Sequence, residues 1–205
     1  LVQAMARKYV PKQKDGNGMR FANIIGFYKP ELISADYVRL NTQLHQEKPE
    51  YGVGGERHAP TVLKLCDSLK TKNVLDYGCG KGRLAKALSW QIAEYDPAVS
   101  GKQESPKPAD IVICTDVLEH IERSKLHRTA EEVNRVARKH VLHKLYTPDN
   151  VLFAALNGRD ISRLSVYNKG FWNELFSSLP DSNIIERNFH LPRAIETVYL
   201  LKKTK

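Results

Sequence analysis

Short apolar runs alternate with amphipathic segments through the centre of the chain, which predicts strands that alternate with helices. The runs that predict strands lie at 73–77, 91–96, 111–116 and 140–146. Segments 83–90 and 122–138 have the spacing of helices. The run at 111–116, IVICTD, is apolar almost throughout, as expected for a parallel strand buried on both faces. This alternation indicates a parallel α/β sheet with right-handed crossovers.

The flanking segments complete this picture. Two helices are expected before the core, one from the N-cap Ser34 through 34–46 and one over 58–70. After it, 147–167 is irregular or partly helical. A helix over 168–179 and two adjacent strands follow, and the short link between those strands suggests one antiparallel strand at the end. The strands are expected at 184–191 and 194–203.

Length and charge bound the organisation of the chain. Its 205 residues support one α/β domain over 34–205, preceded by a basic, partly flexible leader over 1–33. The net charge of +9 admits a nucleic-acid partner, but the charge is scattered, and a solvated surface explains it as well. No apolar run approaches the length of a membrane span. The three cysteines form no metal-type pair or disulfide framework, which favours a cytoplasmic protein.

A glycine-rich turn carries the strongest chemical signal. The segment VLDYGCGKG at 74–82 joins the first core strand to a helix, where the backbone can approach a ligand. A dinucleotide site has the spacing G-x-G-x-x-G, whereas this turn has G-x-G-x-G followed by Arg83. Asp76 lies two residues before the first glycine and would repel a pyrophosphate. S-adenosylmethionine (SAM) instead brings an ammonium, a sulfonium and a ribose, so charge favours SAM. An ordinary strand–helix turn is the other interpretation.

A second carboxylate follows the next strand. Asp96 lies 20 residues after Asp76, where an acid can hold both hydroxyls of a ribose. The alternative is a turn residue before Pro97.

Three segments together resemble a known family. VLDYGCGKG, EYDPAV and ADIVICTDVLEHIE resemble motifs I, II and IV of class I SAM-dependent methyltransferases. Their order and spacing, with YGVGGERHAPTV upstream, are similar to small methyltransferases encoded by tailed phages, which would place the protein in a host cytoplasm. The resemblance covers about 34–200. It implies a Rossmann-like, seven-stranded, mostly parallel sheet with the last strand antiparallel and helices on both faces. The connector 97–109 is short, so the fold is expected to be shortened between strands two and four.

The resemblance also implies a set of cofactor residues. By position, Asp76 and the glycine loop would hold the amino-acid part of SAM, and Asp96 the ribose. Asp116 and Val117 would line the methionine and adenosine side. Tyr51 would cover SAM from the N-terminal side, although a plain loop role is the alternative. The residues of the loop region in this set are Tyr77, Gly78, Cys79, Gly80 and Gly82.

Candidate catalytic residues follow the strand at 111–116 as D-x-x-E-H. At a helix start, Asp116, Glu119 and His120 would share one face and point into one cleft. His120 would act as a general base, the trio would hold a divalent metal, or Glu119 and His120 would only order the cleft. The metal hypothesis needs another ligand, and Arg163 stands where similar proteins have histidine, so no metal is expected. Arg159 and Arg163 suit an anionic acceptor or a solvated surface.

These observations predict an enzyme that transfers a methyl group from SAM to O or N of an unidentified small molecule or nucleotide. The alternatives are an RNA- or DNA-modifying methyltransferase and a non-catalytic SAM-binding module. The chain lacks the (N/D)PPY and PC signatures of DNA base methyltransferases after the fourth strand. The acceptor pocket is expected from 20–57 and 147–180. The helical spacing of Phe171, Trp172 and Phe176 favours core packing over a place in that pocket.

Overall fold

A computed structural model of the chain describes residues 31–148, 163–188 and 196–204, without the side chains of 186–188. Contacts divide the chain into two units, Leu1–Pro30 and Glu31–Lys205, and all described residues belong to the second. Within these described ranges, no helix has the length and apolar character that crossing a membrane requires.

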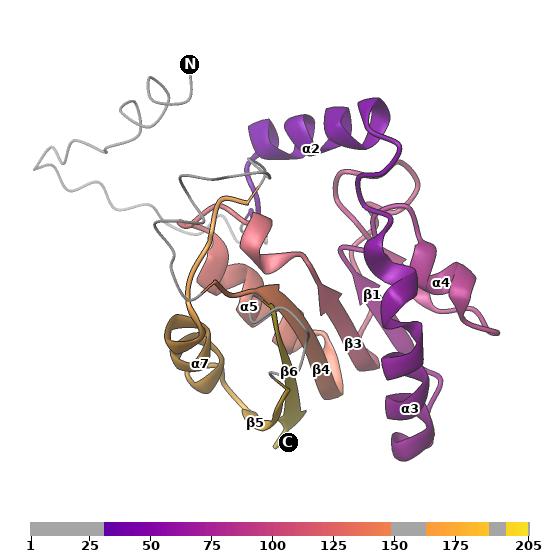
Figure 1. Ribbon diagram of the computed structural model, residues 1–205, viewed down its shortest axis with the longest axis vertical. Coiled ribbons are helices and arrows are strands. Elements are labelled where there is room, and N and C mark those ends of the chain that lie inside the picture. The colour runs from indigo at the N-terminus through magenta and orange to yellow at the C-terminus, as the bar shows by residue number, and fades with distance from the viewer. Residues whose placement is uncertain (1–30, 149–162, 189–195, 205) are drawn as a thin grey trace, which may run out of the picture. The chain divides into compact units, whose positions relative to one another are not determined.

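Six strands form one sheet in the order β2-β1-β3-β4-β6-β5 (Figure 1). β2, β1, β3 and β4 are parallel, and β6 runs antiparallel to both of its neighbours, as predicted. The strands are β1 (Val74–Tyr77), β2 (Ala93–Tyr95), β3 (Ala109–Thr115), β4 (Ala137–Tyr146), β5 (Ser182–Asn188) and β6 (Glu196–Lys203).

The expected seven strands are corrected to six in the described part of the chain. The difference lies in the connector between β2 and β3, where the predicted shortening is confirmed. There the amide of Asp96 donates to the carbonyl of Lys102 at 2.9 Å, which closes a compact turn. Only six residues, two of them prolines, then separate Lys102 from β3. Proline lacks the amide that a ladder needs, and this length cannot supply another strand and helix.

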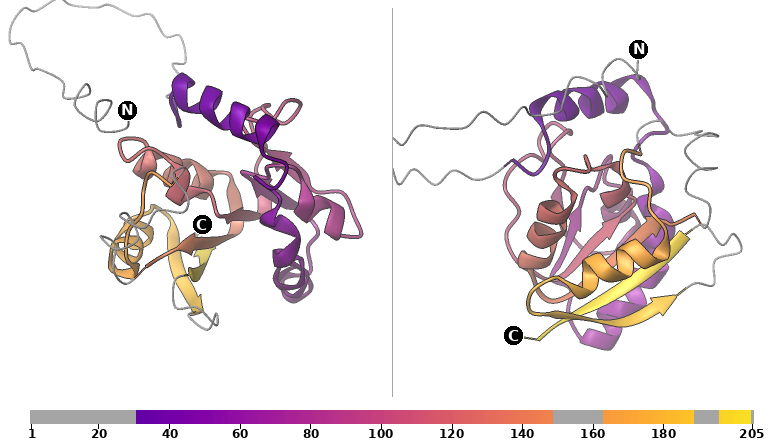
Figure 2. Two further views of the ribbon diagram at one scale, coloured as in Figure 1. Left: turned by 45° about the horizontal axis from the view of Figure 1, so that its top comes forward. Right: turned by 90° about the vertical axis from the view of Figure 1, so that its left-hand side faces the viewer.

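Helices cover both faces of the sheet, as predicted (Figures 1 and 2). α3 (Ala59–Leu69) and α4 (Arg83–Ala87) pack on one face, and α5 (Leu126–Arg135) and α7 (Lys169–Ser177) pack on the other. Strand β3 shows the alternation, since Ile111 and Ile113 join the α3–α4 cluster whereas Val112 and Cys114 join the α5–α7 cluster. All four side chains have no exposed area. The apolar run IVIC is therefore buried on both faces.

Helix α2 (Ala35–Glu47) lies across the end of the sheet toward which β1 and β3 point (Figure 1). It begins at the predicted N-cap, because the Ser34 hydroxyl accepts a hydrogen bond from the amide of Tyr37. The Thr42 hydroxyl donates to the carbonyl of Ala98 at 3.0 Å, and the Thr129 hydroxyl donates to that of Leu32 at 2.8 Å. These contacts fix α2 above the carboxyl ends of the strands.

Two predicted helices are shorter than the sequence pattern suggested. The helix expected at 122–138 is α5, which ends at Arg135 because β4 already begins at Ala137. Ala137 pairs with Ala109 of β3, so the sheet ladder takes the last turn of the expected helix. The helix expected at 83–90 is α4, and it ends at Ala87, after which Leu88 is extended. Trp172 and Phe176 of α7 are fully buried in the core, as their spacing favoured.

Candidate active site

The strand order creates a crevice at the carboxyl ends of the sheet. β2 and β3 lie on opposite sides of β1, so the chain leaves the ends of the strands in opposite directions. Ligands of open α/β sheets bind at such a switch point. A cavity of about 410 Å³ lies there, and the ends of β1, β2 and β3, helix α2 and the segment around η1 (Gly54–His58) line it.

The glycine loop forms one wall of this cavity, and two of its glycines are required by close packing. Gly78 has φ +78°, and a Cβ added there would overlap the side chain of Val117. Gly80 has φ +51°, and a Cβ there would lie 2.6 Å from the carbonyl oxygen of Gly52. Any other side chain would displace the loop, since L-residues also disfavour this backbone region. Gly78, Gly80, Tyr77 and Cys79 line the cavity.

Gly82 lies elsewhere. It precedes α4 in the left-handed conformation, with φ +70°, and a Cβ there would meet Glu94 and Lys102. It is not among the residues that line the cavity, so the structure gives it a role in the turn.

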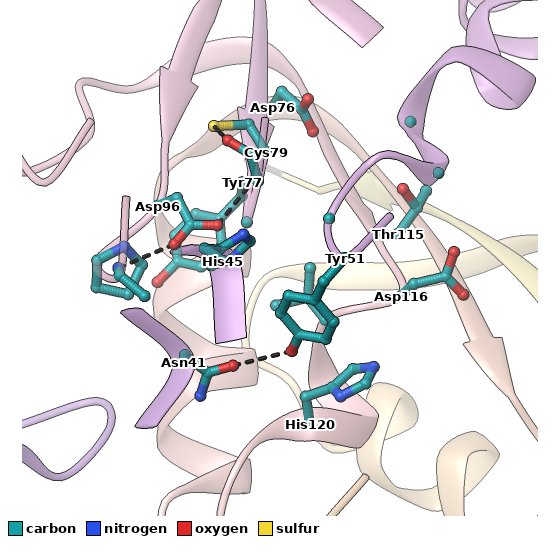
Figure 3. A pocket seen from close by; sticks show the side chains of 18 of the residues that line it. Asn41, His45, Tyr51, Asp76, Tyr77, Cys79, Asp96, Thr115, Asp116 and His120 are labelled. Atoms are coloured by element: carbon teal, nitrogen blue, oxygen red, sulfur yellow. Dashed lines mark hydrogen bonds between the residues drawn. The ribbon is translucent and has the colours of Figure 1, made fainter. Parts of the chain in front are cut away.

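Asp76, at the end of β1, faces the cavity (Figure 3) and is only 4% exposed. Burial, the charge of Glu94 and that of Asp96 raise the pKa of its carboxyl to about 7, although Lys102 acts in the opposite direction. No described side chain forms an ion pair with this carboxylate. A ligand cation would therefore stabilise its charged form, which fits the ammonium of SAM.

Asp96 lies beside the loop and is 7% exposed. One carboxylate oxygen accepts the amide of Gly80 at 3.0 Å, and the other accepts that of Ala98 at 2.9 Å. The residue thus orders the turn before Pro97 and the glycine loop together. Each oxygen has a second lone pair, so the carboxylate can also accept a hydroxyl of a ligand.

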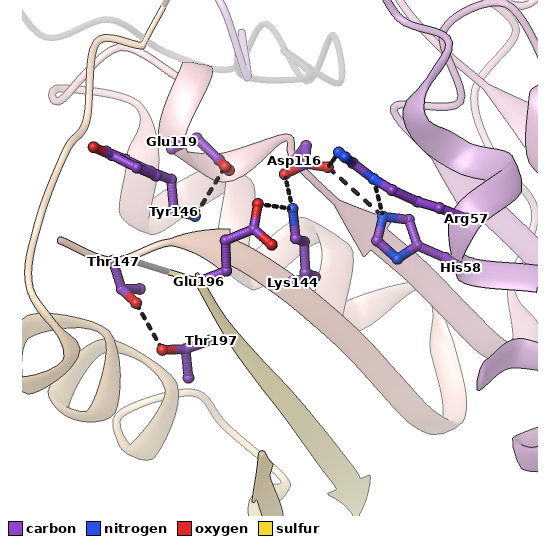
Figure 4. Close-up of polar contacts among 9 residues, drawn as sticks. All are labelled: Arg57, His58, Asp116, Glu119, Lys144, Tyr146, Thr147, Glu196 and Thr197. Carbon is purple, nitrogen blue, oxygen red and sulfur yellow. Dashed lines mark hydrogen bonds and ion pairs between the residues drawn. The ribbon is translucent and has the colours of Figure 1, made fainter. Parts of the chain in front are cut away.

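Asp116 also lines the cavity and belongs to a network of charges (Figure 4). Its carboxylate lies 2.9 Å from Nη2 of Arg57 and 2.6 Å from Nζ of Lys144, which is only 3% exposed. Lys144 reaches Glu196 at 2.6 Å as well. Burial would raise the pKa of Asp116, but the nearby His58, Lys144 and Arg57 outweigh burial and hold that pKa well below its usual range. Asp116 is therefore a fixed anion at the cavity wall.

Glu119 and His120 diverge, so the expectation that the D-x-x-E-H trio shares one cleft is wrong. The segment Leu118–His120 forms a short 3-10 helix, η2, instead of the start of an α-helix. His120 lines the cavity, whereas Glu119 is fully buried and its Oε1 accepts the amide of Tyr146 at 3.1 Å. Burial and the charge of Asp116 raise the pKa of Glu119 to about 8. Glu119 ties η2 to β4 and does not face the cavity.

A set of side chains from α2 completes the cavity, and the sequence pattern did not single them out. The Tyr51 hydroxyl donates to Oδ1 of Asn41 at 2.9 Å (Figure 3). The Tyr51 ring lies edge-on to His45 and to His120, with ring centroids 4.8 and 6.5 Å away. Asn41 and His45 are four residues apart on one helix face, and that polar spacing was the signal available in the sequence.

The remaining candidates are placed as follows. Val117 and Arg163 line the cavity, and the Arg163 guanidinium lies 4.4 Å from the centre of the Tyr146 ring. Arg159 lies outside the described residues. In the described ranges, no group of three or more His, Cys, Asp or Glu is arranged to hold a metal ion.

Comparisons with known proteins agree with this geometry. No curated protein matches the chain by sequence. A Burkholderia thailandensis 1,6-didemethyltoxoflavin-N1-methyltransferase, solved with its acceptor and S-adenosylhomocysteine (SAH), has a similar fold, with TM-score 0.62 and 14% identity over 83% of this chain and 89% of that one. A Synechocystis magnesium protoporphyrin IX methyltransferase with bound SAM gives TM-score 0.58 and 14% identity over 83% and 98%.

A third similar structure is the small RNA methyltransferase HEN1, with TM-score 0.52 and 13% identity over 73% of this chain and 25% of that one. At such identities these likenesses show a shared fold. The sequence itself, over residues 53–185, matches the family model described as a methyltransferase domain. The chain therefore belongs to the methyltransferase domain family.

Proposed function

We propose that the cavity at the ends of β1, β2 and β3 binds SAM and that the enzyme methylates O or N of a small-molecule acceptor. The observation that carries the proposal is Asp76, a buried carboxylate without an ion-pair partner among the described side chains, at the first glycine turn. A buried charge is costly unless an opposite charge approaches it. The ammonium of SAM supplies that charge, whereas a diphosphate would be repelled.

The other residues would contact different parts of the ligand. The loop from Gly78 to Gly80 offers backbone groups to the amino-acid part, and Asp96 accepts from the ribose. Asp116 and Val117, which line the cavity, would lie along the methionine and adenosine side of SAM, and Tyr51 would cover SAM from the N-terminal side. The network of Lys144 and Arg57 fixes the orientation of Asp116. Gly82 supports the turn before α4 and does not contact the ligand.

When bound, SAM supplies an activated methyl group, whose carbon bonds to the acceptor atom as the sulfur keeps the electron pair and becomes the thioether of SAH. The chain holds the two reactants in line, and such positioning supplies roughly 7–11 kcal/mol of the barrier. His120 faces the cavity and takes the proton that the acceptor O or N loses. Glu119 acts through the backbone, because its carboxyl holds Tyr146 of β4.

Two features bear on the acceptor. The similar toxoflavin-type enzyme was solved with 1,6-didemethyltoxoflavin bound, which supports a small-molecule acceptor. An RNA acceptor is the second candidate, favoured by the net charge of +9 and by the likeness to HEN1. Kinship with phage-encoded enzymes rests on the sequence motifs alone.

A screen with tritiated SAM over metabolites, nucleotides, RNA and DNA tests the proposal. We expect label in a small molecule, its loss in Asp76→Ala, and its retention in Asp36→Ala, which removes an exposed acid of α2. Label in RNA or DNA alone would favour the second candidate. Binding of SAM without transfer to any acceptor would favour a non-catalytic module.

A further inference from the structure

Helix α2 closes the cavity from above and is tied to two of its walls. Thr42 bonds the carbonyl of Ala98, directly after the turn at Asp96, and Asn41 accepts the hydroxyl of Tyr51. The same face of the helix carries His45, which lines the cavity (Figure 3). These contacts hold His45 in the half of the cavity that contains Asp96.

The imidazole of His45 is fixed by its neighbours. The Tyr51 ring lies against it, and the backbone of Gly52 comes so close that a Cβ there would lie 2.5 Å from Cε1 of His45. Its Nδ1 is buried and has no hydrogen-bond partner among the described residues. A buried nitrogen of this kind destabilises a protein unless a ligand or water bonds to it.

We propose that His45 hydrogen-bonds a hydroxyl of the cofactor ribose, beside Asp96. The inference rests on the proposed SAM site and adds a ribose ligand from α2. Both oxygens of Asp96 already accept backbone amides, from Gly80 and Ala98. A ribose presents two adjacent hydroxyls, and each of them can donate and accept. An imidazole on α2 beside Asp96 can bond the ribose hydroxyl that Asp96 does not hold, and this bond would give Nδ1 of His45 a partner.

The charges around His45 suit this role. Burial lowers the pKa of His45, the charge of Asp96 opposes this shift, and Lys81 and Lys102 reinforce it. The imidazole is therefore neutral at pH 7, with one nitrogen as donor and the other as acceptor. Lys81 itself is engaged, since its Nζ donates to the carbonyls of Lys48 and Pro49 at 2.7 Å each.

Calorimetric titration of the full chain with SAH and with its 2′-deoxy and 3′-deoxy forms tests the proposal. We expect His45→Phe to weaken SAH binding about tenfold, the size of one hydrogen bond. His45→Asn keeps a polar group near the position of Nδ1 and should recover most of the affinity. His127→Phe, which removes an exposed histidine of α5, should change nothing. With the deoxy ligand that lacks the contacted hydroxyl, wild type and His45→Phe should bind equally.

Two results would overturn the assignment. One is unchanged SAH affinity in His45→Phe, and the other is an equal loss for SAH and both deoxy ligands, which would mean that the ring only packs. Should His45→Phe fail to unfold cooperatively, His45→Ala takes its place in the same comparison. Absence of SAH binding by the wild type would instead refute the proposed cofactor site itself.

Discussion

The amino group of Lys144 bridges Asp116 and Glu196, and the variant Lys144→Met tests what this network contributes to stability. Nζ lies 2.6 Å from each carboxylate, and the lysine side chain is 3% exposed. Removal of one partner from a buried ion pair costs about 3–5 kcal/mol. Here the two carboxylates are 24% and 30% exposed, and Asp116 keeps Arg57. The free energy of unfolding should therefore fall by less than for a fully buried pair, by about 2–3 kcal/mol.

Urea unfolding followed by circular dichroism gives this number directly. For a chain of this size the same loss lowers Tm by roughly 4–12 °C. The matched control is Lys139→Met on the same strand, because Lys139 also pairs with an acid, Asp110 at 2.7 Å, but is 52% exposed. The free energy of unfolding should fall by less than about 1 kcal/mol in this control variant. Equal losses in the two variants would refute the argument that burial makes the Lys144 network strong.

Three further predictions concern protons and packing. Glu119→Gln should remove a pH dependence of stability. Because the pKa of Glu119 is raised to about 8, the native state keeps a proton that the unfolded state loses near 4.5, so the wild type should lose stability as the pH rises between these two values. Unfolding measured at several pH values should show this fall in the wild type and not in the variant, and an equal fall in both would contradict the reasoning. SAH binding near pH 7 should release protons from Asp76, measured by calorimetry in two buffers of different ionisation enthalpy, and Asp76→Asn should abolish that release. Gly78→Ala should cost at least about 2 kcal/mol in urea unfolding, because φ is +78° and Val117 occupies the space, and a smaller loss would mean that Val117 moves aside.

Local patterns predicted the frame of the site. Val74 to Tyr77 form a strand and Gly78 begins the turn because an apolar run followed by glycines has few other structures. The length of the connector after Asp96 predicted the shortened sheet, since the residues available cannot form a strand and a helix. The strand pattern and the glycine turn together predicted the place of Asp76, a polar residue in a buried strand directly before the turn.

Tertiary contacts decided the rest. Glu119 has the helical spacing to join Asp116 and His120, but the tight 3-10 turn directs it to the amide of Tyr146, which no local pattern encodes. His45 reaches the cavity because two contacts hold α2 in place. Thr42 bonds the carbonyl of Ala98, which is distant in the sequence, and Asn41 bonds Tyr51, which follows the helix. The pairing of Lys144 with Glu196 depends on the register of β4 and β6.

The most direct test of the cofactor site is calorimetric titration of wild type and Asp76→Ala with SAH and with a nicotinamide dinucleotide. We predict that the wild type binds SAH and not the dinucleotide, and that Asp76→Ala unfolds cooperatively but no longer binds SAH. Unchanged SAH affinity in Asp76→Ala, or binding of the dinucleotide by the wild type, would contradict selection of the ligand by the buried carboxylate.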